Sequence, residues 1–281
     1  MMDAKTKLCI IIGNPVAHSL SPAIHNAAFS ALGLNFAYTA HRVEDVEAAV
    51  KGIRALGIRG ASVTIPHKLA VIPYLDEVDP VASWIGSVNT IVNDGGKLLG
   101  SNTDGEGAMK ALVEAGVKLP GKRVLMIGSG GAARAVGFTL AAKAKLGALT
   151  ILGIIEPELK KLAGDIAEKT PVKAEGRRMK DEFLAEEIRK ADLLIQCSPV
   201  GMHPKVDETP VPAKLLRKDL IVMDIVYNPR ETRLLREAKA QGAQTIPGLE
   251  MFLNQAVLQF EKWTGKPAPA EIMRQVLEKN L

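Results

Sequence analysis

The sequence lacks several features that mark whole classes of proteins. It has 2 cysteines and 5 histidines among 281 residues, and no C-x-x-C or H-x-x-x-H pair, so we expect neither a disulfide framework nor a metal site. No run approaches the roughly 18 apolar residues of a membrane-spanning helix, and the first residues lack the layout of a signal peptide. We therefore expect a protein of the cytoplasm, without a membrane partner. Cys9 and Cys197 each stand in an apolar run, which predicts buried free thiols.

Aromatic residues and charge of one sign are also scarce. Aromatic residues make up 4% of the chain, the formal net charge is +5, and lysines and glutamates are interspersed, as in EPELKKLAGDIAEK at 156–169. A nucleic-acid-binding surface would gather basic side chains, so we expect no nucleic-acid partner. The core should be mainly aliphatic. The small positive excess suits an anionic small-molecule substrate or cofactor.

Strand-like and helix-like segments alternate along the whole chain. In the first part they predict strands at 7–13, 35–43 and 59–65, helices at 21–33 and 43–57, and an antiparallel hairpin of 87–94 with 97–102. In the second part they predict strands at 123–128, 148–153, 191–199 and 220–227, and helices at 129–147, 248–265 and 269–281. Ser21 is a candidate cap of the first helix, with Pro22 in its first turn and Gly33 at its end.

This alternation predicts an α/β fold of two domains. Residues 1–104, completed by the C-terminal helices in 248–281, would form a domain with a mixed, mostly parallel sheet. Residues 105–247 would form a dinucleotide-binding domain of the Rossmann type.

The segment VLMIGSGGAARA carries the signal for a cofactor. Gly128, Gly130 and Ala133 stand at the G-x-G-x-x-G/A positions, after a predicted strand and at the start of a predicted helix. The glycines allow a tight turn and a close approach of the backbone to a pyrophosphate, which the helix N-terminus attracts. In this context we predict a bound dinucleotide.

The next element of that pattern is missing. At the end of the second strand such folds carry an acid for the ribose of NAD or a base for the 2′-phosphate of NADP. Here the positions are Gly153-Ile154-Ile155, with Glu156 the nearest acid and Lys160 the nearest base. Neither decides between the two cofactors.

Eight segments, in order along nearly the whole chain, resemble the shikimate dehydrogenase family. They are GNPVAHSLSPAIHNAAF, VTIPHK, GSVNT, GSNTDGEG, GSGGAARA, SPVGM, DIVYNPRETRLL and GLEMFLNQA. The resemblance implies reversible, NADP-dependent reduction of 3-dehydroshikimate to shikimate in aromatic amino-acid (chorismate) biosynthesis. It also implies an active site in the cleft between the two domains, and it allows a homodimer.

The resemblance assigns a role to individual residues. Lys68 and Asp104 are implied as the catalytic pair. The implied substrate ligands are Ser19, Ser21, Thr64, Asn89, Tyr227 and Gln255, and the implied cofactor contacts are Gly128, Ser129, Gly130, Gly131, Ala132, Ile225 and Gly248. Simpler interpretations stay open: Ser21 and Asp104 as helix caps, Asn89 and Gly248 as turn residues, Gln255 as a polar helix face, and His18, His25 and His67 as packing residues.

Chemistry favours one role for Lys68. Hydride transfer to a carbonyl develops negative charge on its oxygen, which a nearby ammonium stabilises and can protonate. A carboxylate beside a lysine favours its charged form. We therefore expect Lys68 to act as electrophile and proton donor, with Asp104 orienting it.

The chain departs from the family pattern at one position. Members carry an Asn-Arg-Thr-like run after the second strand of the cofactor domain, and Ile154 replaces its arginine. Loss of an arginine–phosphate pair should weaken the preference for NADP and allow NAD. Rival interpretations are a quinate or dual quinate/shikimate dehydrogenase, a related folate-type or amino-sugar-type dehydrogenase, and a non-catalytic dinucleotide sensor. The sensor is disfavoured by the presence of both Lys68 and Asp104.

Overall fold

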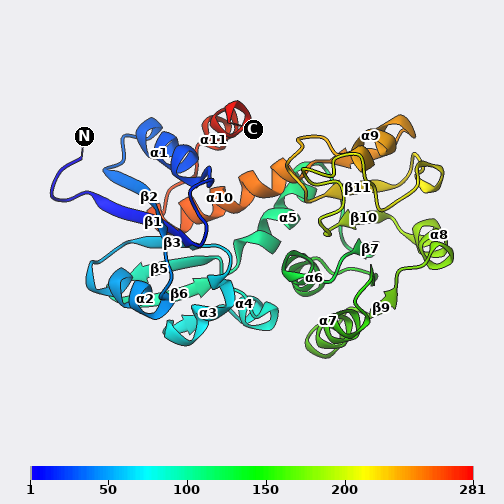
Figure 1. Cartoon of the computed structure of the whole chain (residues 1–281), viewed down its shortest axis with the longest axis horizontal. Coiled ribbons are helices and arrows are strands. Elements are labelled where there is room, and N and C mark those ends of the chain that lie inside the picture. Colours follow the sequence, from blue (N-terminus) through cyan, green and yellow to red (C-terminus); the bar gives the residue numbers. More distant parts are fainter. Residues whose placement is uncertain (1, 281) are drawn as a thin grey trace. The chain divides into compact units, whose positions relative to one another are not determined.

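The computed structural model describes residues 2–280, and the chain forms two α/β units (Figure 1). One unit holds the residues up to Thr103 and from Leu253 onward, and the other holds Asp104–Phe252. The chain passes from one unit to the other within α5 (Thr103–Glu114) and α10 (Gly248–Thr264). Met1 and Leu281, which belong to the predicted first domain and last helix, lie outside the described residues. Within residues 2–280, no helix is both long and apolar enough to cross a membrane.

The first unit is built on a mixed sheet, as predicted, and its six strands lie in the order β2-β1-β3-β5-β6-β4. The strands are β1 (Lys7–Gly13), β2 (Phe36–Arg42), β3 (Gly60–Val63), β4 (Glu77–Val78), β5 (Thr90–Asp94) and β6 (Lys97–Ser101). β1 pairs in parallel with β2 and β3, whereas β5 pairs antiparallel with β3 and β6. The predicted hairpin is therefore confirmed.

Side chains cap two helices of the first unit, α2 (Val46–Ala55) and α4 (Pro80–Ile85). Asp45 accepts the Ala48 N–H at 2.9 Å at the start of α2. The predicted cap of α1 is wrong, because Ser21 is already helical and its own N–H donates to the Ser19 hydroxyl at 3.3 Å. The helices are α1 (Ser21–Ala31), α2 (Val46–Ala55), α3 (His67–Ala70), α4 (Pro80–Ile85) and α11 (Ala270–Lys279), with a 3-10 turn at Ile72–Tyr74.

Several aromatic residues gather in the first unit. His25 stacks on Tyr38 with ring centroids 4.6 Å apart, and the Trp263 ring lies 5.1 Å from His25. A Cβ on Gly60 would lie 2.1 Å from the Trp263 ring, so only glycine lets that ring lie against β3. Burial lowers the pKa of His25 to about 3. A separate cluster of the unit is aliphatic, including Ile10, Ile12, Val50, Ile53, Val63, Ile91 and Leu98.

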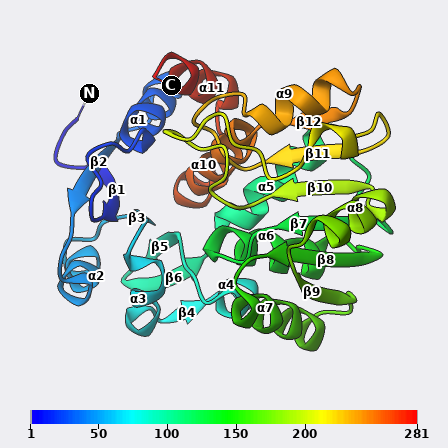
Figure 2. The ribbon, with the colours of Figure 1, turned by 45° about the vertical axis from the view of Figure 1, so that its right-hand side comes forward.

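The second unit is a parallel sheet of six strands in the order β12-β11-β10-β7-β8-β9. Counted from β7, this is the doubly wound order of a Rossmann fold, which confirms the predicted fold class. Figure 2 shows β10, β7, β8 and β9 side by side. The strands are β7 (Arg123–Ile127), β8 (Ala148–Gly153), β9 (Ala174–Arg178), β10 (Leu193–Gln196), β11 (Ile221–Asp224) and β12 (Gln244–Ile246).

Helices cover this parallel sheet, and an aliphatic core lies beneath α8 and α9. That core joins Leu125, Leu194 and Val222 of the strands to Ile188 and Leu234 of the two helices. The helices are α6 (Gly131–Lys143), α7 (Glu156–Lys169), α8 (Asp181–Lys190) and α9 (Arg233–Ala240), with a 3-10 turn at Ala213–Leu215.

Candidate active site

The carboxyl ends of β1 and β3 meet at one edge of the first sheet. Ile12 pairs with Val63 across these parallel strands, and the Thr64 N–H donates to the Ile12 carbonyl at 3.0 Å. A Cβ on Gly13 would lie 2.3 Å from Thr64 Cγ2, so glycine is needed for this close approach. Thr64, a predicted substrate ligand, is therefore fixed and half-buried just beyond β3.

The loop after β1 carries the predicted serine pair to the amino end of α1. Ser21 is buried, Ser19 is half-buried, and the Ser19 hydroxyl accepts the Ser21 N–H. The Ser19 N–H in turn donates to the Val16 carbonyl at 3.0 Å. A helix N-terminus attracts anions through its N–H groups and its dipole. The pair thus stands where a carboxylate is favoured.

His67 and Lys68 begin α3, shortly after β3. The His67 ring is buried, as the packing interpretation expects, and its Nε2 also donates to the Val43 carbonyl at 2.8 Å. The Lys68 carbonyl accepts the Val88 N–H at 2.8 Å. These bonds anchor the helix that carries the half-buried Lys68.

Asn89 stands immediately before β5, whose antiparallel pairing with β3 brings it to the same edge. Its Oδ1 accepts the Thr103 N–H at 2.8 Å and the Thr90 hydroxyl at 2.7 Å. Because a backbone N–H only donates, this contact fixes which end of the Asn89 amide is oxygen. Asn89 is 3% exposed, so it is a buried, oriented amide and not a surface turn residue.

A chain of buried hydrogen bonds behind Asn89 was missed by the sequence analysis. The Tyr38 hydroxyl donates to Ser62 Oγ at 2.6 Å, and Ser62 donates to Gln259 Oε1 at 2.8 Å. The Gln259 amide nitrogen then donates to Thr90 Oγ1 at 2.9 Å. Gln259 follows the half-buried Gln255 by one turn on α10. This four-residue spacing, which places both on one helix face, is the signal that could have found it.

The glycine turn of the second unit follows β7, as predicted. Gly128 has a φ of +113°, and a Cβ there would lie 3.0 Å from the Cys197 carbonyl. A Cβ on Gly130 or Gly131 would meet no atom of the described residues within 4 Å, so this side of the turn is open. α6 begins at Gly131 with Ala132 in its first turn, and its first N–H groups are available for an anion. The turn therefore fits the pyrophosphate of a dinucleotide.

Other predicted residues of the second unit lie near the ends of β11 and β12. A Cβ on Gly248 would lie 2.4 Å from the Ile225 carbonyl oxygen. These two residues are thus neighbours, and their contact requires glycine. Tyr227 is 39% exposed, and its ring lies 5.0 Å from that of Phe252. Asp104 lies in the first turn of α5.

Comparison with known proteins decides the family. A family model of the shikimate dehydrogenase substrate binding domain matches residues 11–91, and one of the shikimate 5′-dehydrogenase C-terminal domain matches residues 248–278. The chain is 46% identical over 278 residues to a shikimate dehydrogenase (NADP(+)) of Moorella thermoacetica. The match covers 98% of this chain and 94% of that protein. The chain belongs to the shikimate dehydrogenase family.

Solved structures of this family share the fold. The shikimate 5-dehydrogenase of Listeria monocytogenes, in complex with shikimate and NAD, is 40% identical with a TM-score of 0.94, and the match covers 98% of each chain. A quinate dehydrogenase from Corynebacterium glutamicum, in complex with NAD, is 30% identical with a TM-score of 0.89. That match covers 98% of this chain and 99% of the other.

Buried titratable groups lie in both units of this family member. Asp224, the last residue of β11, accepts the Val226 N–H at 3.0 Å and the Thr232 hydroxyl at 2.7 Å. Burial nevertheless raises its pKa to about 6. Burial also raises the pKa of Cys9 to about 12 and that of Cys197 far above its ordinary value. Both thiols are free, as predicted, and are poor nucleophiles.

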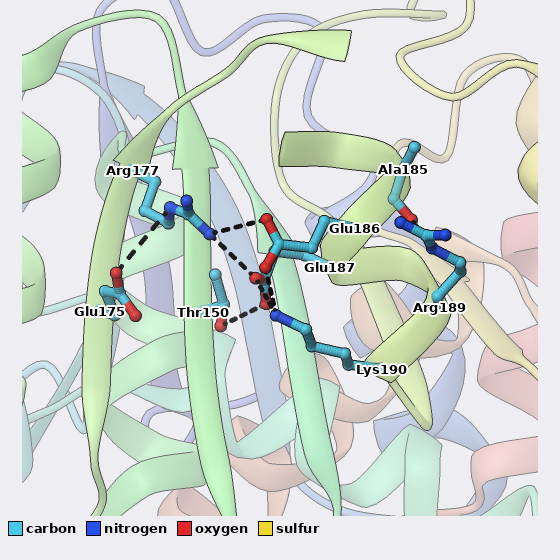
Figure 3. Close-up of polar contacts among 8 residues, drawn as sticks. All are labelled: Thr150, Glu175, Arg177, Ala185, Glu186, Glu187, Arg189 and Lys190. Carbon is cyan, nitrogen blue, oxygen red and sulfur yellow. Dashed lines mark hydrogen bonds and ion pairs between the residues drawn. The ribbon is translucent and has the colours of Figure 1, made fainter. Parts of the chain in front are cut away.

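A second charged cluster lies outside the predicted site, between β8, β9 and α8 (Figure 3). The carboxylate of Glu187 accepts from Arg177 at 3.0 Å, from Lys190 at 3.0 Å and from Thr150 at 3.3 Å. The Arg177 guanidinium also lies 4.1 Å from the centroid of the Phe183 ring. Among the described residues, no group of His, Cys, Asp and Glu side chains could hold a metal ion.

Proposed function

We propose that the chain catalyses the reversible reduction of 3-dehydroshikimate to shikimate, a step of aromatic amino-acid (chorismate) biosynthesis, with NADP(H) or NAD(H) as hydride carrier. The proposal is carried by the gathering of Ser19, Thr64 and Asn89 at one edge of the first sheet, with Lys68 in the helix that follows β3. Hydroxyls, an amide and an ammonium are the groups that recognise a carboxylate and ring hydroxyls. Family membership supports the same activity.

Each predicted residue takes a role in this reaction. Ser19 and Ser21 bind the substrate carboxylate at the amino end of α1. The ligands of the ring hydroxyls or the carboxylate are Thr64, Asn89, Tyr227 and Gln255. When bound, the dinucleotide supplies or receives the hydride, and its pyrophosphate is held at the glycine turn by Gly128, Ser129, Gly130, Gly131 and Ala132, with Ile225 and Gly248 beside the nicotinamide.

Lys68 is the proposed proton donor. In reduction, its ammonium stabilises the charge that develops on the carbonyl oxygen and delivers a proton to it. Asp104 orients the amine. In the oxidative direction the same group takes the proton back, so that alkaline conditions favour oxidation.

A quinate or dual quinate/shikimate dehydrogenase is the second candidate, and the likeness to the Corynebacterium glutamicum enzyme favours it. Purified protein is mixed with NADP or NAD at alkaline pH, then with shikimate or with quinate, and cofactor reduction is followed by absorbance. We expect reduction with shikimate. Reduction with quinate alone would replace the proposal, and cofactor binding without any turnover would favour a non-catalytic sensor.

We also propose a cytoplasmic location and a homodimer. The sequence favours the cytoplasm, and the family resemblance allows a homodimer. Fractionation of the host cells and light scattering of the purified protein measure these two properties.

A further inference from the structure

An acidic side chain reaches the glycine turn from the neighbouring βα unit. Glu158 lies in the first turn of α7, and its Oε2 accepts a hydrogen bond of 2.9 Å from the hydroxyl of Ser129. Ser129 is the middle residue of the Gly128-Ser129-Gly130 turn. In a dinucleotide fold, the adenosine ribose lies between this turn and the end of the second strand, which is β8 here. Glu158 therefore places a carboxylate beside the ribose position.

The end of β8 itself offers nothing to a phosphate. Ile154 and Ile155 follow the strand and are 79% and 47% exposed. The next residue, Glu156, is paired with Lys160 at 2.8 Å. The first turn of α7 thus brings two carboxylates, Glu156 and Glu158, to the place where a 2′-phosphate would lie.

A cation of the neighbouring strand β9 is placed to oppose them. Arg178 ends β9 and pairs in register with Gly153 at the end of β8. Successive side chains of a strand point to opposite faces. The Arg177 side chain points to α8 (Figure 3), so Arg178 lies on the opposite face of β9, together with Gly176. α7 packs against that face, because a Cβ added to Gly176 would lie 2.6 Å from the Leu159 carbonyl oxygen.

The charge of Arg178 is partly offset on that face. Lys160 first of all, and then Arg178 and Lys180, hold the pKa of Glu156 below its usual range, so these cations lie near that carboxylate. Lys180 also lies 5.7 Å from the centroid of the Phe183 ring of α8. A dianionic 2′-phosphate here would meet the carboxylates of Glu156 and Glu158 as well as these cations.

We propose that Glu158 accepts hydrogen bonds from the adenosine ribose hydroxyls of NAD and repels the 2′-phosphate of NADP, so that this chain prefers NAD(H). A ribose hydroxyl takes over the hydrogen bond that the Ser129 hydroxyl gives to Glu158. A hydrogen bond to a carboxylate is among the stronger neutral-to-charged contacts. The proposal rests on the proposed function in that the cofactor is a nicotinamide dinucleotide.

Calorimetric titration of NADH and NADPH into the full chain, without shikimate, tests the proposal. We expect NADH to bind roughly tenfold more tightly or better. Glu158→Gln keeps the side-chain shape but loses its charge, and should shift the NADH:NADPH affinity ratio toward NADPH by roughly tenfold. Glu182→Gln is the matched control, because it removes an exposed acid from the first turn of α8. It should leave the ratio unchanged.

Two fragments separate the ribose site from the rest of the cofactor. Glu158→Gln should weaken 5′-AMP and strengthen adenosine 2′,5′-bisphosphate, while Glu182→Gln changes neither. The proposal would be overturned if the wild-type chain bound NADPH more tightly than NADH, or if both variants changed the affinity ratio equally. Arg178 would then be the candidate ligand of the 2′-phosphate. Turnover of shikimate is measured separately. If the enzyme is active but prefers NADPH, only this inference is wrong. If the chain binds NADH more tightly but does not turn over shikimate, only the proposed function is wrong.

Discussion

The side-chain amide of Gln259 in α10 donates a hydrogen bond of 2.9 Å to the hydroxyl of Thr90, a residue 169 positions earlier in the sequence. The Thr90 hydroxyl in turn donates to Asn89 Oδ1, and Gln259 Oε1 accepts a hydrogen bond from the Ser62 hydroxyl. Asn89, Thr90 and Gln259 are all at most 3% exposed. A helix from the far end of the chain thus supports Thr90, which in turn donates to the predicted substrate ligand Asn89.

Replacing Gln259 should disturb both stability and substrate binding. Gln259→Ala removes the acceptor of the buried Ser62 hydroxyl and a donor to the buried Thr90 hydroxyl, which costs about 2–3 kcal/mol of unfolding free energy. Because Asn89 loses its support, we expect KM for shikimate to rise several-fold more than kcat falls. The control is Gln275→Ala, an exposed glutamine of α11. Chemical unfolding and steady-state kinetics provide the measurements, and an unchanged KM would refute the positioning role.

Lys68→Ala should lose turnover far more than substrate affinity. The variant lacks the group proposed to donate the proton, and general acid catalysis contributes roughly 10²–10⁴-fold. Lys51→Ala, an exposed lysine of α2, is the control. Shikimate affinity is measured by calorimetry and kcat by cofactor absorbance. Equal losses in both quantities, or near-normal turnover, would speak against the role.

His25 should make the first unit sensitive to acid. Its pKa is lowered to about 3 in the folded chain, below its ordinary value of 6.5, so the unfolded chain binds the proton first as pH falls. Stability is therefore present above about pH 6.5 and is lost on acidification, by about 2 kcal/mol at pH 5. His25→Phe, which keeps a ring against Tyr38, should reduce this loss. An imidazole NMR signal that titrates near neutral pH would contradict the prediction.

Asp224 should have the opposite effect. Its pKa is raised to about 6 from 3.8, so the folded chain holds a proton that the unfolded chain has released. The stabilising contribution is present below about pH 4 and is lost as pH rises through 6, amounting to about 2–3 kcal/mol. Asp224→Asn keeps an acceptor for Thr232, so its unfolding free energy should rise relative to wild type between these pH values. A constant difference between the two proteins would rule out this titration.

Local sequence predicted the fold where apolar runs are long. The runs at 7–13, 123–128 and 148–153 became β1, β7 and β8. The edge strands β9 and β12 were not predicted, because their sequences AEGRR and QTI contain few apolar residues. Ser21 was misplaced as a cap because the Ser19 hydroxyl takes its N–H, and two serines that lie two positions apart cannot be ranked from spacing.

The residues that orient the site could not be predicted from the sequence, for a different reason. The bond between Gln259 and Thr90 joins residues on different elements, and only the folded register brings them together. The same holds for Glu158 and Ser129, whose contact depends on how α7 follows β8. Family motifs identified candidate ligands, but the residues that orient them are visible only in three dimensions.

The ion cluster around Glu187 affects how the stability of the protein depends on temperature. Ionic groups lose less hydration free energy on burial as temperature rises, because the hydration of charge carries a strongly negative entropy. Glu187 is shared by Arg177 and Lys190, so the cluster is a network and not an isolated pair. Its contribution should therefore be small near room temperature and grow as the protein warms.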